Sequence, residues 1–283
     1  MAEWTETYRG TVAPWECDVT EHFTVAYYFD RIDQAAALLA DRLGLGDSGT
    51  AGVFPRRLTL RFARELRAAA SFHIASAPIG LDPVLRLGHR VINSASGETV
   101  TWVEDIWEAP SASLSPERRA AIGRQLAVWE APATEARPEP KTLTGAIPTA
   151  RGRVQPADLD ERGHLSLAGF VHRFTDALLQ AIAAIGFTAD YTKTARRGFS
   201  TFELALRLAA APRLGDAYLV ETGIAHLGGS SVRFIHRMSD ARTGAELARL
   251  GQFGVQLDLD ARRPAPLPAE LRAAAAKLML SLD

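Results

Sequence analysis

Two aspartates and two histidines stand at one spacing in two distant parts of the sequence. Asp18 precedes His22 by four residues, and Asp160 precedes His164 by four. Each pair lies in a polar loop that leads into a stretch with the pattern of a long helix. A carboxylate there can act as a nucleophile or as a general base on water, and the free N–H groups of a helix start can polarise a carbonyl group. The spacing therefore allows each Asp/His pair to converge on a group that lies at the helix start.

A purely structural role is the alternative for these residues. Aspartate is common in turns and at helix N-caps, so Asp18 and Asp160 could simply organise their loops. His22 and His164 are poor candidates for metal ligands, because no second cluster with ligand spacing accompanies them. We expect neither a metal nor an organic cofactor.

The two loops belong to a longer internal repeat. With a constant offset of 142, residues 9–45 match residues 151–187 without a gap, and 10 of these 37 positions are identical. The later segments stay in phase with small insertions; His89-Arg90, for example, corresponds to His236-Arg237. Because there are two copies of a long period, we interpret the repeat as a duplicated domain rather than a solenoid. For the two histidines, a structural hydrogen bond is the preferred role.

Each copy shows the same order of predicted elements. A short strand (about 6–13 and 147–155) precedes the loop, a helix of about 20 residues follows (24–43 and 166–185), and four strands come next. These strands are expected near 54–65, 70–79, 84–93 and 99–108, and near 199–209, 216–227, 231–239 and 245–257. A closing helix is expected after Pro116 and after Pro268. We predict a first unit at 1–130 (the first repeat), a Pro-rich, exposed linker at 131–146, and a second unit at 147–283 (the second repeat).

The motif resembles that of a known family. Pro14-Trp-Glu-Cys-Asp18-Val-Thr-Glu-His22 and Pro156-Ala-Asp-Leu-Asp160-Glu-Arg-Gly-His164 are similar to the Asp-x-x-Gly-His-x-Asn-x-x-x-Tyr segment of hot-dog acyl thioesterases, including the double hot-dog acyl-ACP enzymes and relatives of 4-hydroxybenzoyl-CoA thioesterase. The resemblance implies an α+β, tandem hot-dog fold, with two antiparallel sheets that each wrap a long helix and join edge to edge.

The resemblance also implies an activity and a set of site residues. The expected reaction is hydrolysis of an acyl-CoA or acyl-ACP thioester, with the acyl group in an apolar slot along the long helix where the copies meet. Asp18, His22, Asp160 and His164 would be catalytic, and Trp15, Thr24, Tyr28 and Ser166 would contact the substrate. Arginines 56, 57, 196 and 197 are weaker candidates for phosphate contact.

Both copies depart from the family pattern, and two alternatives follow. The Asn two residues after His is Thr24 in one copy and Ser166 in the other, while Phe170 stands where Tyr28 would be repeated. This loss favours a non-catalytic acyl-thioester-binding scaffold. A hot-dog hydratase or dehydratase is the other alternative, although such enzymes usually space Asp and His one residue further apart.

The composition excludes several other classes of protein. The formal net charge of −1 provides no basic field for nucleic acid or an anionic membrane, and the single cysteine, Cys17, allows no disulfide within the chain. No signal peptide, membrane span, Walker loop, dinucleotide fingerprint or Gly-x-Ser-x-Gly elbow is present. We expect a cytoplasmic protein whose partner is its thioester substrate, with a homodimer of the tandem chain as a possible assembly.

Overall fold

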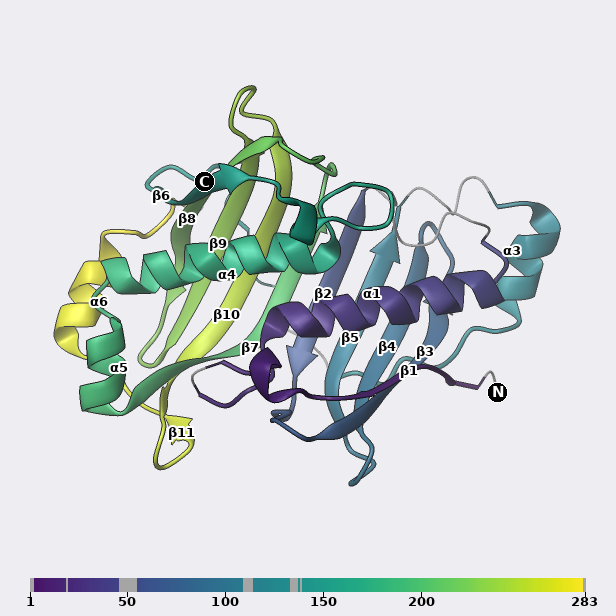
Figure 1. The fold of residues 1–283 in the computed structure, drawn as a ribbon, viewed down its shortest axis with the longest axis horizontal. Coiled ribbons are helices and arrows are strands. Elements are labelled where there is room, and N and C mark those ends of the chain that lie inside the picture. Colours follow the sequence, from purple (N-terminus) through teal and green to yellow (C-terminus); the bar gives the residue numbers. More distant parts are fainter. Residues whose placement is uncertain are drawn as a thin grey trace.

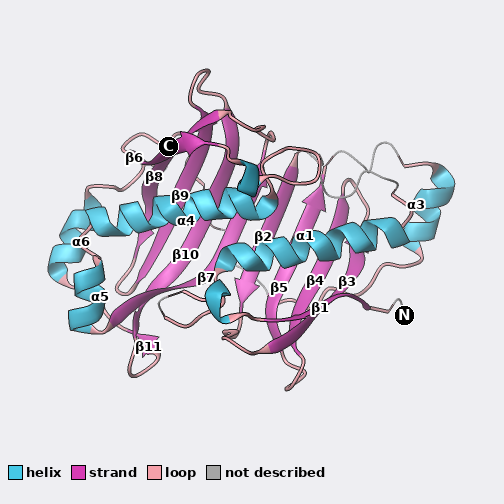
Figure 2. Ribbon diagram, in the orientation of Figure 1, coloured by secondary structure: helices cyan, strands magenta, loops and turns pink. Residues whose placement is uncertain are grey.

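One antiparallel sheet of 11 strands curves around two long helices in the computed structural model, which describes residues 3–18, 20–45, 55–108, 114–132, 137 and 139–281 (Figures 1 and 2). The first repeat contributes β1 (Thr5–Thr11), α1 (Val25–Arg42), β2 (Arg56–Phe62), β3 (Ser71–Gly80), β4 (Leu85–Asn93), β5 (Thr99–Trp107) and α3 (Pro116–Gly123). The second repeat contributes β6 (Ile147–Arg153), α4 (Leu167–Ala184), α5 (Ala189–Ala195), β7 (Arg197–Leu208), β8 (Ala217–Leu227), β9 (Ser231–Asp240), β10 (Glu246–Asp258), β11 (Arg263–Pro264) and α6 (Ala269–Ala276).

The central helices bury a stripe of apolar side chains against the sheet. In α1 this stripe includes Phe29 and Ile32, and in α4 it includes Phe170 and Phe174, all with at most 1% of their surface exposed. Spacings of three and four residues place such side chains on one helix face. Each helix is followed by a glycine with positive φ, as the pattern predicts for a helix C-terminus.

The two halves of the sheet meet where β2 pairs with β7. The strand order is β1-β3-β4-β5-β2-β7-β10-β9-β8-β6, and β11 pairs with β10. Thr59 faces Ala205 across this β2–β7 seam, and the pair on one side of it, Leu58–Leu206, mirrors the pair on the other side, Leu60–Leu204. This register confirms the predicted α+β fold with two hot-dog units joined edge to edge, related by a local twofold axis at the seam.

The helices also meet across this axis. α1 and α4 pack against each other, with the rings of Tyr27 and His172 edge to face at 5.6 Å. The leucines of the β2–β7 seam and the inner faces of both helices belong to one apolar cluster. Because the two repeats share a core, neither half buries its apolar surface alone.

The segment between the repeats lies on the outer face of the sheet. Its described residues, 131–132, 137 and 139–146, form neither helix nor strand. Arg137 lies 3.9 Å from the ring centroid of Phe253, Glu139 pairs with Arg233, and Arg249 Nη1 donates to the carbonyl of Pro140 at 3.0 Å. Most of these residues are exposed, as predicted for the linker, but Pro140 is buried; Pro138 lies outside the described residues.

Candidate active site

The two Asp/His loops have the same backbone. A 3-10 turn, Pro14–Glu16 in the first repeat and Pro156–Asp158 in the second, precedes each loop. The N–H of Asp18 donates to the carbonyl of His22 at 2.9 Å, and the N–H of Asp160 donates to that of His164 at 2.7 Å. The chain then enters α1 or α4, so each loop delivers its Asp/His pair to a helix N-terminus.

The aspartate carboxylates organise these loops. Asp18 Oδ1 accepts hydrogen bonds from the N–H of Thr20 at 2.8 Å, from its hydroxyl at 2.6 Å, and from the N–H of His22 at 3.2 Å. Asp160 Oδ1 accepts from the N–H groups of Arg162 and His164, both at 2.9 Å. The turn role is therefore present in both repeats. It engages Oδ1 in each case, and Oδ2 has no hydrogen bond within the described ranges.

Two successive side-chain hydrogen bonds link Asp18 to His22. The Thr20 Oγ1 atom lies 3.1 Å from His22 Nδ1. An ionised carboxylate can only accept, so the Thr20 hydroxyl proton points at Asp18 and its oxygen accepts from the ring. Neutral His22 must then carry its proton on Nδ1, which leaves the lone pair on Nε2. Sequence reasoning missed Thr20, although it lies midway between the two motif residues.

The second repeat supplies a residue to the first-repeat site. His22 Nε2 lies 2.9 Å from Glu65 Oε2 and 2.9 Å from Arg262 Nη2. Arg262 comes from the turn between β10 and β11, and it also donates to Glu65 at 2.7 Å. In Figure 1 this yellow hairpin lies beside the purple loop that precedes α1. The first-repeat site is therefore built from both halves of the chain.

The surroundings of His164 are different. Its Nδ1 is buried and has no hydrogen-bond partner among the described residues, and its backbone pairs with Arg213. The second-repeat loop offers Arg162 where the first offers Thr20, and arginine has no oxygen to bridge the carboxylate and the ring. Like backbones thus carry unlike side-chain networks.

A second pair of acids anchors each loop to its helix. Glu16 is 5% exposed and accepts from the N–H of Ala13 at 2.9 Å while it pairs with Arg31 of α1. Asp158 and Arg173 repeat the arrangement at 3.3 Å. The sequence carries a signal for these ion pairs, because Arg31 and Arg173 are identical positions of the repeat.

The predicted substrate-contact residues lie in different environments. Trp15 is 80% exposed beside the first loop, whereas Tyr28 is 3% exposed and packs on Phe23, and burial raises the pKa of its phenol. Thr24 and Ser166 are the N-caps of α1 and α4. Ser166 Oγ accepts from the N–H of Gly169 at 3.0 Å, but the Thr24 side chain makes no such bond.

The arginines suggested for phosphate contact are all paired within the chain. Arg56 is 3% exposed and forms a two-pronged ion pair with fully buried Asp105, so the suggestion is wrong for this residue. Arg57 pairs with Glu108, and Arg196 and Arg197 pair with aspartates at the β10–β11 turn.

The repeated strand histidines have structural partners. His89 Nδ1 lies 2.7 Å from the Ser76 hydroxyl, and His236 Nδ1 lies 2.8 Å from that of Thr222. Both rings are completely buried, and burial lowers their pKa values to about 4 for His89 and about 3 for His236. They are neutral at physiological pH and lie away from the loops, as expected for the structural role.

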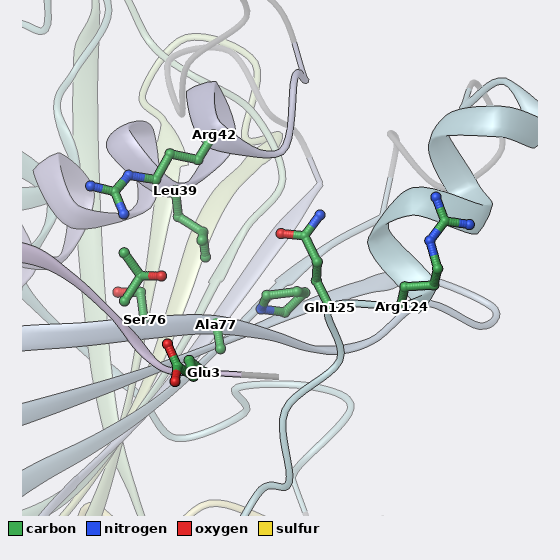
Figure 3. A pocket seen from close by; sticks show the side chains of 9 residues that line it. Glu3, Leu39, Arg42, Ser76, Ala77, Arg124 and Gln125 are labelled. Atoms are coloured by element: carbon green, nitrogen blue, oxygen red, sulfur yellow. The ribbon is translucent and has the colours of Figure 1, made fainter. Parts of the chain in front are cut away.

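One cavity of about 270 Å³ lies at the far end of α1 from the first-repeat loop (Figure 3). It is lined by Glu3, Thr5, Leu39, Arg42, Ser76, Ala77, Pro78, Arg124 and Gln125. Its position and polar lining differ from the apolar slot expected where the copies meet. Among all the described residues, no group of three or more His, Cys, Asp or Glu side chains is placed to hold a metal ion. None of the described helices combines the length and the apolar character that a membrane span needs.

Comparison with known proteins places this geometry in context. Residues 154–275 match the model of the Thioesterase-like superfamily. The matched residues all lie in the second repeat. No curated protein sequence matches the chain significantly.

Solved structures extend the similarity over both repeats. A putative oleoyl thioesterase from Lactobacillus plantarum matches with a TM-score of 0.66 and 16% identity, covering 90% of this chain and 97% of that one. A 12:0-ACP thioesterase from Umbellularia californica matches with a TM-score of 0.62 and 15% identity, covering 88% and 96%. An acyl-ACP thioesterase from Bacteroides thetaiotaomicron matches with a TM-score of 0.62 and 12% identity, covering 87% and 96%. At these identities the likeness establishes the fold, and it confirms the resemblance to double hot-dog thioesterases at that level.

Proposed function

We propose that this chain hydrolyses acyl thioesters of CoA or ACP, and that the first-repeat loop carries the reaction. The proposal rests on one observation above all. A hydrogen-bonded chain Asp18–Thr20–His22 stands directly before a helix whose N-cap residue, Thr24, makes no side-chain hydrogen bond to the N–H groups of the first turn. Such groups favour developing negative charge on a carbonyl oxygen.

In the proposed reaction, the free Oδ2 of Asp18 takes a proton from a water molecule. The water oxygen adds to the thioester carbonyl carbon, and the N–H groups at the start of α1 hold the oxyanion. The intermediate then collapses with cleavage of the C–S bond, and the proton held by Asp18 passes to the departing thiolate. The products are a carboxylic acid and a thiol, so no cofactor is required. Direct attack of the carboxylate on the carbonyl, followed by hydrolysis of the anhydride, is the other route open to the same residue.

We assign the second-repeat pair a lesser role. Ser166 occupies an N–H at the start of α4, and Arg162 replaces the bridging hydroxyl of Thr20, so Asp160 and His164 lack two features of the first site. We further propose that residues 1–130 and 147–283 are the two hot-dog units, that 131–146 connects them, and that the protein acts in the cytoplasm.

Purified protein incubated with short, branched, aromatic and long acyl-CoAs, with free thiol detected, tests the proposal. Asp18→Asn should lower kcat on the best substrate by roughly 10²–10⁴, the usual effect of losing an essential acid or base or an oxyanion donor. Asp160→Asn is the matched control and should lower it far less. If both folded variants retain the wild-type rate, the proposed role of the aspartates is wrong. If the wild-type protein hydrolyses none of the acyl-CoAs, the acyl-thioester-binding scaffold becomes the better interpretation.

A further inference from the structure

We infer that Arg262, which the second repeat delivers to the first-repeat loop, is a positioning residue that fixes which ring nitrogen of neutral His22 carries the proton. This inference deepens the proposed function, because it assigns a role to a residue beyond the Asp/His motif. It rests on three features of the site: the position of the guanidinium, the geometry of the hairpin, and the hydrogen bonds on the other side of the ring.

The guanidinium lies between two acceptors. The acceptors are His22 Nε2, 2.9 Å from Arg262 Nη2, and Glu65 Oε2, 2.7 Å from the same nitrogen, and they are themselves only 2.9 Å apart. An Nε2 lone pair facing a carboxylate at that distance would be repelled. A donor shared between the two removes the repulsion, and arginine, which remains protonated, can only donate.

The hairpin that carries Arg262 is firmly built. Asp258 Oδ1 accepts from the N–H groups of Asp260 and Ala261, and the Asp258 carboxylate also pairs with Arg197 at 2.9 Å. Arg262 itself has φ of 54° and donates its N–H to the carbonyl of Asp258 at 2.8 Å. A side chain on such a turn is held in place rather than searching for a partner.

The other side of the ring demands the same proton position. The Thr20 oxygen accepts from Nδ1 because its own proton is given to Asp18. Two further charged groups beside the loop, Glu21 and Arg67, face each other at 4.0 Å. Arg67 also pairs with Glu65 at 3.4 Å, so it restrains the carboxylate rather than the ring. Arg262 and Thr20 thus select together the tautomer with hydrogen on Nδ1.

Removal of Arg262 should reverse the tautomer, with the Thr20 hydroxyl turning from Asp18 to donate to Nδ1. Glu65 would then be the group left at Nε2, and a carboxylate there attracts a proton onto that nitrogen. Long-range ¹H–¹⁵N correlation NMR at a pH where the ring is neutral reads the position directly. Wild-type protein should show Nδ1–H, Arg262→Met should show Nε2–H, and Arg262→Lys, which keeps a charged donor, should retain Nδ1–H in a measurable fraction.

Kinetics provide a second readout. With the best acyl-CoA, Arg262→Met should lower kcat about tenfold or more while KM changes less than about twofold. The reason is that the substitution alters the position of the proton on the His22 ring and not the affinity for substrate. Arg263→Met is the matched control: it removes the same charge from the next residue of the hairpin, and that side chain forms no hydrogen bond or ion pair with the described residues of the first repeat. Should Arg262→Met fold poorly, Arg262→Asn suits the positive φ and is too short to reach His22.

Two results would overturn the inference: an Nδ1–H tautomer that persists in folded Arg262→Met and Arg262→Asn, or equal losses of kcat in Arg262→Met and Arg263→Met. The tautomer is measured without substrate. It therefore decides the inference even if no acyl thioester is hydrolysed, an outcome that would count against the proposed function instead.

Discussion

Replacement of Asp105 by asparagine should destabilise the protein more than any conservative change at its surface. Asp105 is completely buried and accepts from Arg56 Nε at 2.9 Å, from Arg56 Nη2 at 2.7 Å and from Trp107 Nε1 at 2.9 Å. Asparagine has the same shape but no charge, and its NH₂ group would face one of these donors. The Arg56 cation would remain in the core without its main counter-charge.

The magnitude follows from the burial of both partners. Breaking a buried ion pair on one side costs about 3–5 kcal/mol. Asp33 stays 2.8 Å from Arg56 Nη1 and offsets part of this loss, so we expect a value near the lower limit, about 3 kcal/mol. Asp33→Asn is the matched control. Its carboxylate is 27% exposed and makes a single contact, so about 1 kcal/mol is expected.

Urea denaturation at pH 7.5, followed by tryptophan fluorescence, measures both changes in the free energy of unfolding. A second variant, Arg56→Met with Asp105→Leu, should recover most of the stability, because it leaves no charge in the core. Asp33 also loses its partner, but its carboxylate is 27% exposed and can be hydrated. The second repeat already lacks the pair: Phe202 and Gln252 occupy the corresponding positions of β7 and β10. Equal destabilisation by Asp105→Asn and Asp33→Asn would refute the reasoning.

Three further outcomes are expected. Burial lowers the pKa of His89 to about 4 and that of His236 to about 3 from 6.5, so their contribution to stability is complete above pH 6.5 and is lost as the pH falls toward these values. Free energies of unfolding from urea denaturation at pH 7 and pH 5 should therefore differ by about 2 kcal/mol or more. Ser166→Ala should cost about 1 kcal/mol, and Thr24→Ala almost nothing, because only Ser166 caps its helix; equal urea midpoints would contradict this. Trp15→Ala should leave the free energy of unfolding within about 0.5 kcal/mol of wild type but raise KM for acyl-CoA. An unchanged KM would show that Trp15 does not contact the substrate.

The repeat and its loops could be predicted from the sequence because they depend on local patterns. Apolar spacing, turn-forming residues and the recurrence of Asp18 and His22 at a fixed offset are all visible in the chain. They predict the long helices, the strands that follow them and the joined sheet. The 3-10 turns before each loop, α5 and β11 were not predicted, since each is shorter than two helical turns or one ordinary strand.

The side-chain networks of the site could not be predicted in the same way. Arg262 is 240 residues from His22, and the two meet because the turn that follows β10 lies beside the first-repeat loop. Arg56 looks like a surface arginine in the sequence, and its burial depends on Asp105 of a neighbouring strand. Glu16 lies between these cases, because Arg31 and its equivalent Arg173 recur in the repeat but their partners differ in type.

The covalent connection along the outer face of the sheet changes what the two halves can become. In a dimer of identical single-unit chains, every substitution appears on both sides of the axis, so a residue that helps one site must also be tolerated at the other. Here the chain tethers one particular first half to one particular second half, at an effective concentration set by a short linker. Arg262 and the Arg56–Asp105 pair can therefore exist once per molecule. The linker allows the two loops to diverge, and their side-chain networks already differ at Thr20 and Arg162.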